Sequence, residues 1–286
     1  MKTIETDIIA LDLDDTLLKS DLSISDYTVE TLRKAAEQGI YIVIASGRAD
    51  NAILPSVRRL ELAGTEQGRY IIGQNGTSIT DLHTRQPVYT RVLPGDIAVR
   101  AYEIASENTI PSHIYDGDII YTSMHNRWSA IDAELSGLRL ELVEDYPSFI
   151  AARAALSSRE GPSKGVSKVV LTGDPDRIQH IQRELKEEFR ERATVFTSKP
   201  FFLEIMPPGA GKGEALAFLA EKLHIPKERV MAFGDSMNDE SMIRYAGSGV
   251  AMKNGLPYIQ SIARYVTEQT HDEDGIACFI RQHCLD

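Results

Sequence analysis

A short apolar run that ends in three carboxylates constrains the fold of this chain more than any other feature. Residues 8–11 have the composition of a strand buried on both faces of a parallel sheet, and Asp12, Asp14 and Asp15 follow directly. In open α/β sheets, ligands bind beyond the carboxyl ends of the strands. Carboxylates this close repel one another, and a hard cation such as Mg2+ would relieve that repulsion. A solvated acidic turn is the alternative, because Asp-x-Asp spacing is common in turns.

Two further apolar runs end in groups suited to anion binding or to a tight turn. Residues 40–45 lead into Ser46, Gly47 and Arg48, which offer a hydroxyl, a flexible backbone and a guanidinium. Followed by a helix, this combination suits a phosphate, and an ordinary loop is the alternative. Residues 70–73 lead into the Gln-Asn-Gly-Thr sequence of residues 74–77, which predicts a tight turn.

A second acidic cluster follows the apolar run at residues 230–233. A glycine turn there carries Asp235, Asn238 and Asp239, so two separated strand ends hold groups that bind metals. Lys212 follows a Pro-Pro-Gly-Ala-Gly linker and is a candidate point charge for a phosphate, with a solvated helix start as the alternative. The segment is not a P-loop, because Gly213 stands where Ser or Thr is required. The two acidic strand ends, together with Ser46 and Lys212, would converge on one pocket.

Composition narrows the function classes. With 286 residues, two domains are a better expectation than one, and a formal net charge of −11 argues against nucleic acid or an anionic membrane as the principal partner. The two cysteines, Cys278 and Cys284, lack metal-ligand spacing and suit a reducing compartment. No stretch reaches the roughly 20 apolar residues of a membrane helix, and no signal peptide is recognisable, so we expect a soluble, cytoplasmic protein.

From about residue 84 the sequence alternates between helix-like and strand-like segments whose polar residues form no obvious functional cluster. This change predicts a separate domain in the middle of the chain. Expected elements are a helix at 94–108, strands at 119–122 and 168–172, a helix capped by Asp174, and a hairpin formed by 194–197 and 201–205. Near the C-terminus, residues 271–275 read His-Asp-Glu-Asp-Gly. We expect their carboxylates to cap the last helix rather than to bind a metal.

These motifs resemble those of the haloacid dehalogenase superfamily of phosphohydrolases, and more closely its Cof-type branch of sugar-phosphate phosphatases. Two further matches are the Asn75-Gly76 turn and the Gly-Val-Ala-Met-x-Asn pattern at residues 249–254. Ser46 stands where Thr is usual and Thr77 where Ala is common, and neither change removes a functional group. The four main motifs occur in the family's order, as Asp12-Leu13-Asp14-Asp15-Thr16, Ser46-Gly47-Arg48, Lys212-Gly213 and Gly234-Asp235-Ser236-Met237-Asn238-Asp239.

The resemblance implies an α/β fold: a Rossmann-like, doubly wound parallel sheet core at residues 1–85 and 208–286, with an inserted α+β cap of class II, subclass B, at 86–207. It also implies a role for each motif. Asp12 is the nucleophile and Asp14 the general acid and base, while Mg2+ is held by Asp12, the Asp14 backbone carbonyl and Asp235. The phosphoryl group would be bound by Ser46, Gly47, Lys212 and Asn238, with support from Thr16, Arg48 and Asp239.

The implied function is Mg2+-dependent hydrolysis of small phosphomonoesters, with sugar phosphates favoured, through an aspartyl-phosphate intermediate. A phosphotransferase or mutase that uses the same intermediate is one alternative, and a non-catalytic sugar-phosphate sensor is another. The cap would contact the leaving group, and His113, Tyr115 and Asp116 lie in a polar stretch that we expect to be turn-like. An ordinary surface hairpin loop is the alternative for that stretch. The sequence leaves the oligomeric state open.

Overall fold

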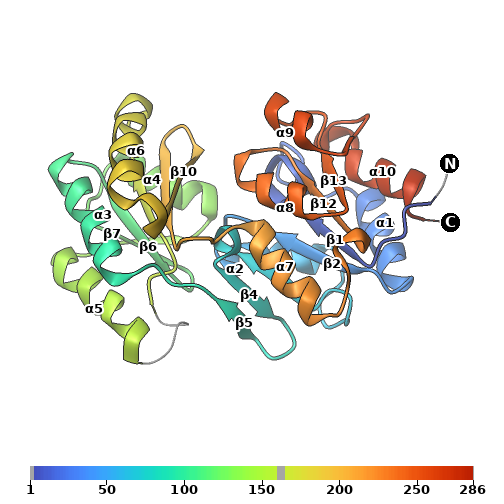
Figure 1. The fold of residues 1–286 in the computed structure, drawn as a ribbon, viewed down its shortest axis with the longest axis horizontal. Helices are drawn as coiled ribbons and strands as arrows, with labels where there is room; N and C mark the ends of the chain where they lie inside the picture. Colours follow the sequence, from blue (N-terminus) through green and yellow to red (C-terminus); the bar gives the residue numbers. More distant parts are fainter. Residues whose placement is uncertain (1–2, 160–164, 286) are drawn as a thin grey trace. The chain divides into compact units, whose positions relative to one another are not determined.

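The computed structural model describes residues 3–159 and 165–285, and the chain divides into two compact units. The core unit comprises residues 1–88 and 211–286, and the cap unit comprises the continuous segment 89–210 (Figure 1). Each junction lies three residues beyond the position expected from the sequence. At the first junction this is because strand β5 (Gln86–Thr90) pairs into the eight-stranded sheet, and its first three residues belong to the core unit.

The sheet of the core unit has eight strands in the order β14-β13-β12-β1-β2-β3-β4-β5. The neighbours from β14 to β3 pair in parallel, whereas β3 and β4 pair antiparallel, so the predicted parallel sheet is mixed at one edge. The predicted apolar runs are confirmed as its central strands, buried because helices cover both faces. In sequence order the remaining bounds are β1 (Ile8–Leu11), β2 (Tyr41–Ala45), β3 (Tyr70–Gly73), β4 (Ser78–Asp81), β12 (Val230–Gly234), β13 (Ser248–Ala251) and β14 (Tyr265–Val266).

Alternate residues of the central strands pack against helices of the core unit. Leu11 and Phe233 join a buried cluster with Leu32 of α1 and Phe279 of α10, where the two phenylalanine rings meet edge to face at 5.6 Å. Ser25 caps α1 by accepting a hydrogen bond from the Thr28 backbone amide. The helices of this unit are α1 (Asp26–Glu37), α2 (Asp50–Arg59), α7 (Lys212–Lys222), α8 (Glu240–Tyr245), α9 (Pro257–Ile262) and α10 (Gly275–His283).

The cap unit has its own six-stranded sheet in the order β10-β11-β9-β6-β7-β8, mostly antiparallel, with β7 and β8 parallel. One face packs against α3, α5 and α6 through an apolar cluster that includes Ile114, Leu171 and Ile178. Asp174 caps α6 as predicted, and the predicted hairpin is β10 and β11. The bounds are α3 (Gly95–Glu107), β6 (Ser112–Asp116), β7 (Ile119–Thr122), α4 (Arg127–Ser136), β8 (Arg139–Leu142), α5 (Tyr146–Arg159), β9 (Val169–Thr172), α6 (Pro175–Phe189), β10 (Thr194–Lys199) and β11 (Phe202–Met206).

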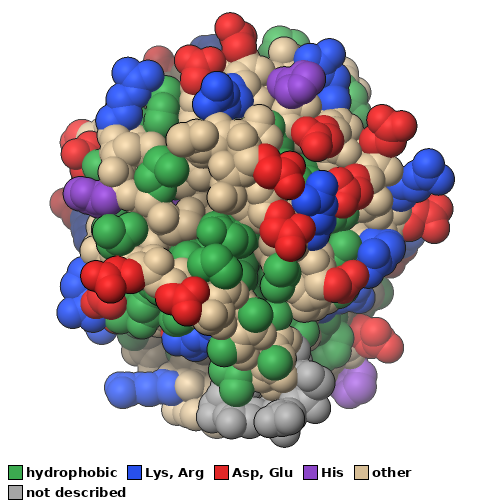
Figure 2. Space-filling view, turned by 90° about the vertical axis from the view of Figure 1, so that its left-hand side faces the viewer, with side chains coloured by type: hydrophobic (Ala, Val, Ile, Leu, Met, Phe, Trp, Pro, Cys, Tyr) green, Lys and Arg blue, Asp and Glu red, His purple; other side chains and the backbone are tan. Residues whose placement is uncertain are grey.

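The surface of the cap unit carries charges of both signs. In the view of Figure 2, Lys and Arg side chains are interspersed with Asp and Glu side chains. One such contact joins two helices, because Arg100 of α3 pairs with Glu188 of α6 at 2.7 Å. Within the described ranges of the chain, none of the helices is both long and apolar enough to cross a membrane.

Candidate active site

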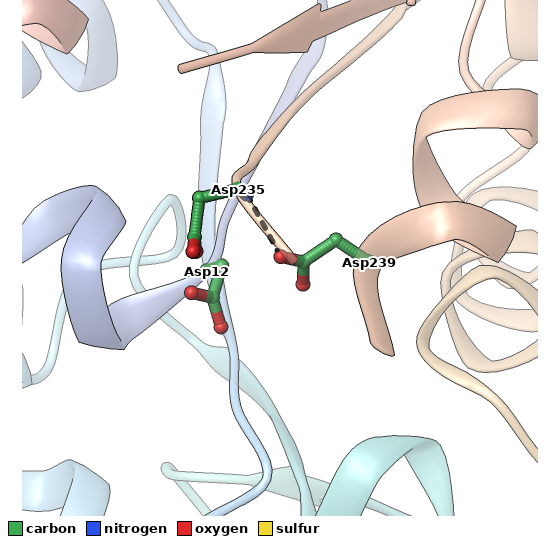
Figure 3. A group of neighbouring side chains, drawn as sticks. All are labelled: Asp12, Asp235 and Asp239. Atoms are coloured by element: carbon green, nitrogen blue, oxygen red, sulfur yellow. Dashed lines mark hydrogen bonds between the residues drawn. The ribbon is translucent and has the colours of Figure 1, made fainter. Parts of the chain in front are cut away.

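Three carboxylates meet at the carboxyl ends of the two central strands. Asp12 follows β1 and Asp235 follows β12, and these strands pair in register with Leu11 opposite Phe233. Asp239 ends the short 3-10 helix η6 (Met237–Asp239). One carboxylate oxygen from each residue lies within 4.8 Å of the other two (Figure 3). One member of the first acidic cluster, Asp12, therefore lies beside two members of the second. Asp12 is buried, so its interpretation as part of a solvated turn is wrong.

Lys212 lies between two of these carboxylates. It is the first residue of α7, its side chain is fully buried, and its Nζ donates to Asp12 and, at 2.6 Å, to Asp239. Burial alone would lower the pKa of Lys212, but the two carboxylates raise it above its ordinary value, so the ammonium stays charged. The alternative interpretation of Lys212 as a solvated helix start is wrong.

The carboxylates repel one another despite the lysine. Burial and the neighbouring charge of Asp239 raise the pKa of Asp12 well above its ordinary value, and the same two causes raise the pKa of Asp235 to about 7. Lys212 brings one positive charge to a cluster of three carboxyl groups. The group therefore favours an additional cation, and its all-oxygen donor set fits a hard divalent ion such as Mg2+.

The hydrogen bonds of the cluster separate candidate metal ligands from a supporting residue. Oδ2 of Asp239 accepts from the backbone amides of Asp235 at 2.9 Å and Ser236 at 3.1 Å, while its Oδ1 accepts from Lys212. Both oxygens of Asp239 are thus engaged in orienting its neighbours. In the described part of the chain, the carboxylate of Asp235 accepts one hydrogen bond, at 3.0 Å from the hydroxyl of Thr16. Asp12 and Asp235 are therefore the side chains best disposed to hold a metal.

The loop after β1 has an irregular backbone that separates Asp12 from Asp14. It forms a π-type turn, η1 (Leu13–Leu17), in which Asp14 is extended and Asp15 is left-handed with φ of 58°. The carboxylate of Asp14 is 40% exposed and makes a two-pronged pair with Arg48, at 3.0 Å from Nε and 2.5 Å from Nη2. Arg48 thus contacts the carboxylate of Asp14 directly, a pairing that the sequence did not predict.

Ser46 and Gly47 lie in a loop at the end of β2, next to β1 in the sheet. The Ser46 hydroxyl accepts a bond from the Arg48 amide at 3.1 Å, and the Ser46 carbonyl accepts from the Asn75 amide at 2.9 Å. A Cβ on Gly47 would lie 3.0 Å from the Asn75 side chain, so a larger residue there would press on Asn75. The loop is therefore fixed by its contacts rather than freely mobile.

Asn75 connects this loop to the other motifs. It is buried, has φ of 55°, and its Oδ1 accepts from Asn238 Nδ2 at 3.1 Å. Gly76 has φ of 87°, and a Cβ there would lie 2.1 Å from the Gly211 carbonyl oxygen, so only glycine fits against the start of α7. The sequence indicated only a tight turn at these positions. A buried Asn-Gly pair directly after a central strand was the signal for this wider role.

The three candidates in the cap unit form contacts of their own. His113 and Tyr115 lie in strand β6, so the expected turn-like conformation is wrong for them and applies only to residues 117 and 118. His113 is fully buried, and its Nδ1 lies 2.7 Å from Asp132, which also accepts a bond from Tyr115 at 2.6 Å. Asp116 pairs with Arg153 at 2.6 Å. Within the cap unit, His113 and Tyr115 thus belong to a buried polar network.

Comparisons with known proteins agree with this geometry. The haloacid dehalogenase-like hydrolase family matches residues 9–280. The HMP-PP phosphatase of Serratia proteamaculans is 30% identical over 277 residues, which cover 96% of this chain and 94% of that protein. The crystal structure of a haloacid dehalogenase-like hydrolase from Bacteroides thetaiotaomicron matches with a TM-score of 0.84 and 34% identity, covering 97% of this chain and 99% of that one.

A more distant solved structure shares the fold. A HAD subclass IIB sugar phosphatase matches with a TM-score of 0.81 and covers 97% of this chain and 98% of that one. Its 22% identity shows the fold alone. Because the family match spans almost the whole chain, this protein belongs to the haloacid dehalogenase-like hydrolase family, in its Cof-type branch, and is a phosphomonoesterase.

Proposed function

We propose that this chain is a Mg2+-dependent phosphatase that removes phosphate from small phosphomonoesters, with sugar phosphates the favoured class, through an aspartyl-phosphate intermediate. The observation that carries the proposal is the buried group of Asp12, Asp235 and Asp239 with Lys212 between two of its members. A nucleophilic carboxylate, a fixed positive charge and oxygen donors for a metal stand together at the strand ends. Phosphoryl transfer through a covalent intermediate requires these three kinds of functional group.

Asp12 is the proposed nucleophile. Its carboxylate would attack phosphorus in line with the leaving oxygen, so that one difficult displacement becomes two easier ones. Lys212 donates to Asp12, and it would hold the attacking oxygen in place and neutralise charge on the transferring group. Asp239 would keep Lys212 oriented, because it accepts from the same Nζ. Asp12, Asp235 and the Asp14 carbonyl would hold Mg2+, which would neutralise charge on the phosphoryl oxygens when bound.

Asp14 is the proposed general acid and base. It would protonate the leaving oxygen in the first step and take a proton from the attacking water in the second. Arg48 holds the Asp14 carboxylate in a two-pronged pair, so Asp14 must exchange this pair for contacts with the substrate before it can act. Ser46, the Gly47 amide and Asn238 are the proposed phosphate ligands, since their loops are tied together through Asn75.

Substitution of Asp12 provides the test. Asp12→Asn keeps the size of the side chain but removes the nucleophile, so turnover should fall to background while far-ultraviolet circular dichroism stays unchanged. Brief incubation of the wild type with labelled substrate, followed by acid quench, should trap phosphate on the protein, and the variant should trap none. Asp21→Asn, on an exposed residue of a following turn, is the matched control and should behave as wild type. Full turnover by Asp12→Asn would refute the covalent mechanism.

The alternatives give different products. With an aryl phosphate and Mg2+, a phosphatase releases free phosphate, whereas a phosphotransferase or mutase transfers phosphate to an added acceptor. A non-catalytic sensor does neither. The presence of both Asp12 and Asp14, with Lys212 beside the nucleophile, argues against a sensor. The similarity to an HMP-PP phosphatase favours hydrolysis over transfer to an acceptor. A screen of sugar phosphates, nucleotides, pyridoxal phosphate and flavin mononucleotide then identifies the preferred ester. We further propose that the cap unit sets this preference and that the protein acts in the cytoplasm.

A further inference from the structure

The loop after β1, η1 (Leu13–Leu17), is called the catalytic loop below. Its backbone has one unfavourable conformation that contacts from other parts of the chain must stabilise. Asp15 has φ of 58°, a region that costs non-glycine residues about 1 kcal/mol and persists where neighbouring groups enforce it. The peptide group between Asp14 and Asp15 turns with this angle. The direction of the Asp14 carbonyl therefore depends on Asp15 remaining left-handed. The proposed function makes that carbonyl a metal ligand.

Asn254 supplies support from a distant part of the chain. Its Nδ2 donates to the Asp15 carbonyl at 2.8 Å, and its Oδ1 accepts from the His271 backbone amide at 3.0 Å. One carboxamide thus connects the loop after β13, the catalytic loop and the short helix η7 (His271–Glu273). Because donor and acceptor ends are both used, the amide has a single orientation.

A second set of contacts holds the residues that follow the catalytic loop. Asp272 accepts from the amide and hydroxyl of Ser20 at 2.8 and 2.7 Å, and the Asp272 carbonyl accepts from Lys19 Nζ at 2.8 Å. The Asp274 carboxylate pairs with Lys19 at 3.1 Å and accepts from Ser25 at 2.7 Å. The prediction that these carboxylates cap the last helix is therefore wrong, since Asp274 makes no side-chain cap bond to α10.

We propose that Asn254 and η7 form a clamp that fixes the conformation of the catalytic loop, and that Asn254 is a positioning residue for the Asp14 carbonyl and hence for the metal. This inference rests on the proposed function for the role of that carbonyl. It does not place Asn254 in contact with substrate. The two sets of contacts bracket the loop, one at Asp15 and the other at Lys19 and Ser20.

Two substitutions at Asn254 test the clamp. Asn254→Ala removes both bonds of the carboxamide, and Asn254→Asp keeps an acceptor for the His271 amide but loses the donor to Asp15. The neighbouring Lys253 has an exposed side chain, and Lys253→Ala is the matched control. Loss of one hydrogen bond corresponds to about a fivefold change in an equilibrium constant. We expect both Asn254 variants to raise the Mg2+ dissociation constant, measured by calorimetry, about fivefold, with the control unchanged.

Hydrogen exchange provides a readout that is independent of activity. In the metal-free protein, amides of residues 15–18 should exchange about fivefold faster in Asn254→Ala, while peptides from β1 and β12 keep wild-type rates. Local loosening of this kind separates positioning from a general loss of stability. Wild-type Mg2+ affinity and wild-type exchange in both Asn254 variants would overturn the clamp, even if the protein is a phosphatase. A wild-type protein without phosphatase activity would refute the proposed function instead, because the affinity and exchange comparisons need no turnover.

Discussion

The raised pKa of Asp235 predicts that Mg2+ binding weakens steeply in acid. Burial and the charge of Asp239 raise this pKa to about 7, and a metal ligand must lose its proton to bind. Below pH 7 the ion competes with a proton on Asp235, so affinity should fall about tenfold per pH unit, or about 100-fold between pH 8 and pH 5. Asp12, whose pKa burial also raises, adds to the effect in the same direction.

The same shift predicts how the metal-free protein responds to pH. The folded-state pKa of Asp235 lies above its unfolded value of 3.8, so the native state binds the proton more tightly. The stability contributed by that proton is complete below pH 3.8 and is lost as pH rises through about 7. The difference of 7 − 3.8 = 3.2 pKa units corresponds to about 4 kcal/mol as an upper value. Mg2+ should therefore increase the melting temperature more at pH 8 than at pH 5.

Calorimetric titration with Mg2+ from pH 5 to 8 measures the effect directly. Titrations in buffers with different ionisation enthalpies should show release of at least about one proton per ion near pH 6. Titratable groups elsewhere affect stability with and without Mg2+ alike, so the difference in melting temperature isolates the site. Asp235→Asn should lose most of the affinity and most of its dependence on pH. An Mg2+ affinity that is constant from pH 5 to 8 in the wild type would refute the reasoning.

Three further predictions follow from named contacts. Asp14→Asn should slow hydrolysis of alkyl phosphates much more than that of aryl phosphates, whose leaving groups need no acid; equal losses would remove Asp14 as the acid. Lys212→Met leaves Asp12 and Asp239 buried without their cation and should cost about 3–5 kcal/mol of unfolding free energy in urea titrations at pH 7.5, whereas the exposed Lys222→Met should cost almost nothing. Arg91 donates to the Pro208 carbonyl at 2.9 Å, so a short Gly-Ser bridge can replace residues 92–207. The shortened protein should hydrolyse aryl phosphates weakly and lose the wild-type ranking of rates among natural esters. A retained ranking would contradict a role of the cap unit in specificity.

Particular residues show which parts of the site could be read from the sequence. Asp12 and Asp235 were identifiable because each follows an apolar run typical of a central strand, and strand ends of a parallel sheet share an edge. Lys212 was ambiguous, since a lysine after a Gly-rich linker has the same local pattern whether it is solvated or buried. Its burial depends on α7 beginning against the Asn75-Gly76 turn, a contact between segments far apart in the chain.

At His113 the sequence suggested a functional role that the position of the residue in the fold does not support. Its polar surroundings in the sequence suggested a turn open to ligands, yet it lies in strand β6 and bonds to Asp132 of helix α4. Local composition could not reveal this, because the partner comes from another element. Strands β4 and β5 were missed for a related reason, because neither is an apolar run. The burial of Ile79 and Asp81 in β4 comes from the pairing and packing of that strand rather than from its local composition.

The sequence by itself determined the central strands, the helix start at Asp174, and the residues that follow the strands, because each depends on periodicity, caps and turns within a few neighbouring residues. Tertiary structure decided the pairing of Arg48 with Asp14, the bridge made by Lys212, and the hydrogen bond from Asn254 to Asp15. Those contacts join residues 27 to 239 positions apart. Their geometry depends on how strands and helices pack, and that packing is a property of the whole chain rather than of any local pattern.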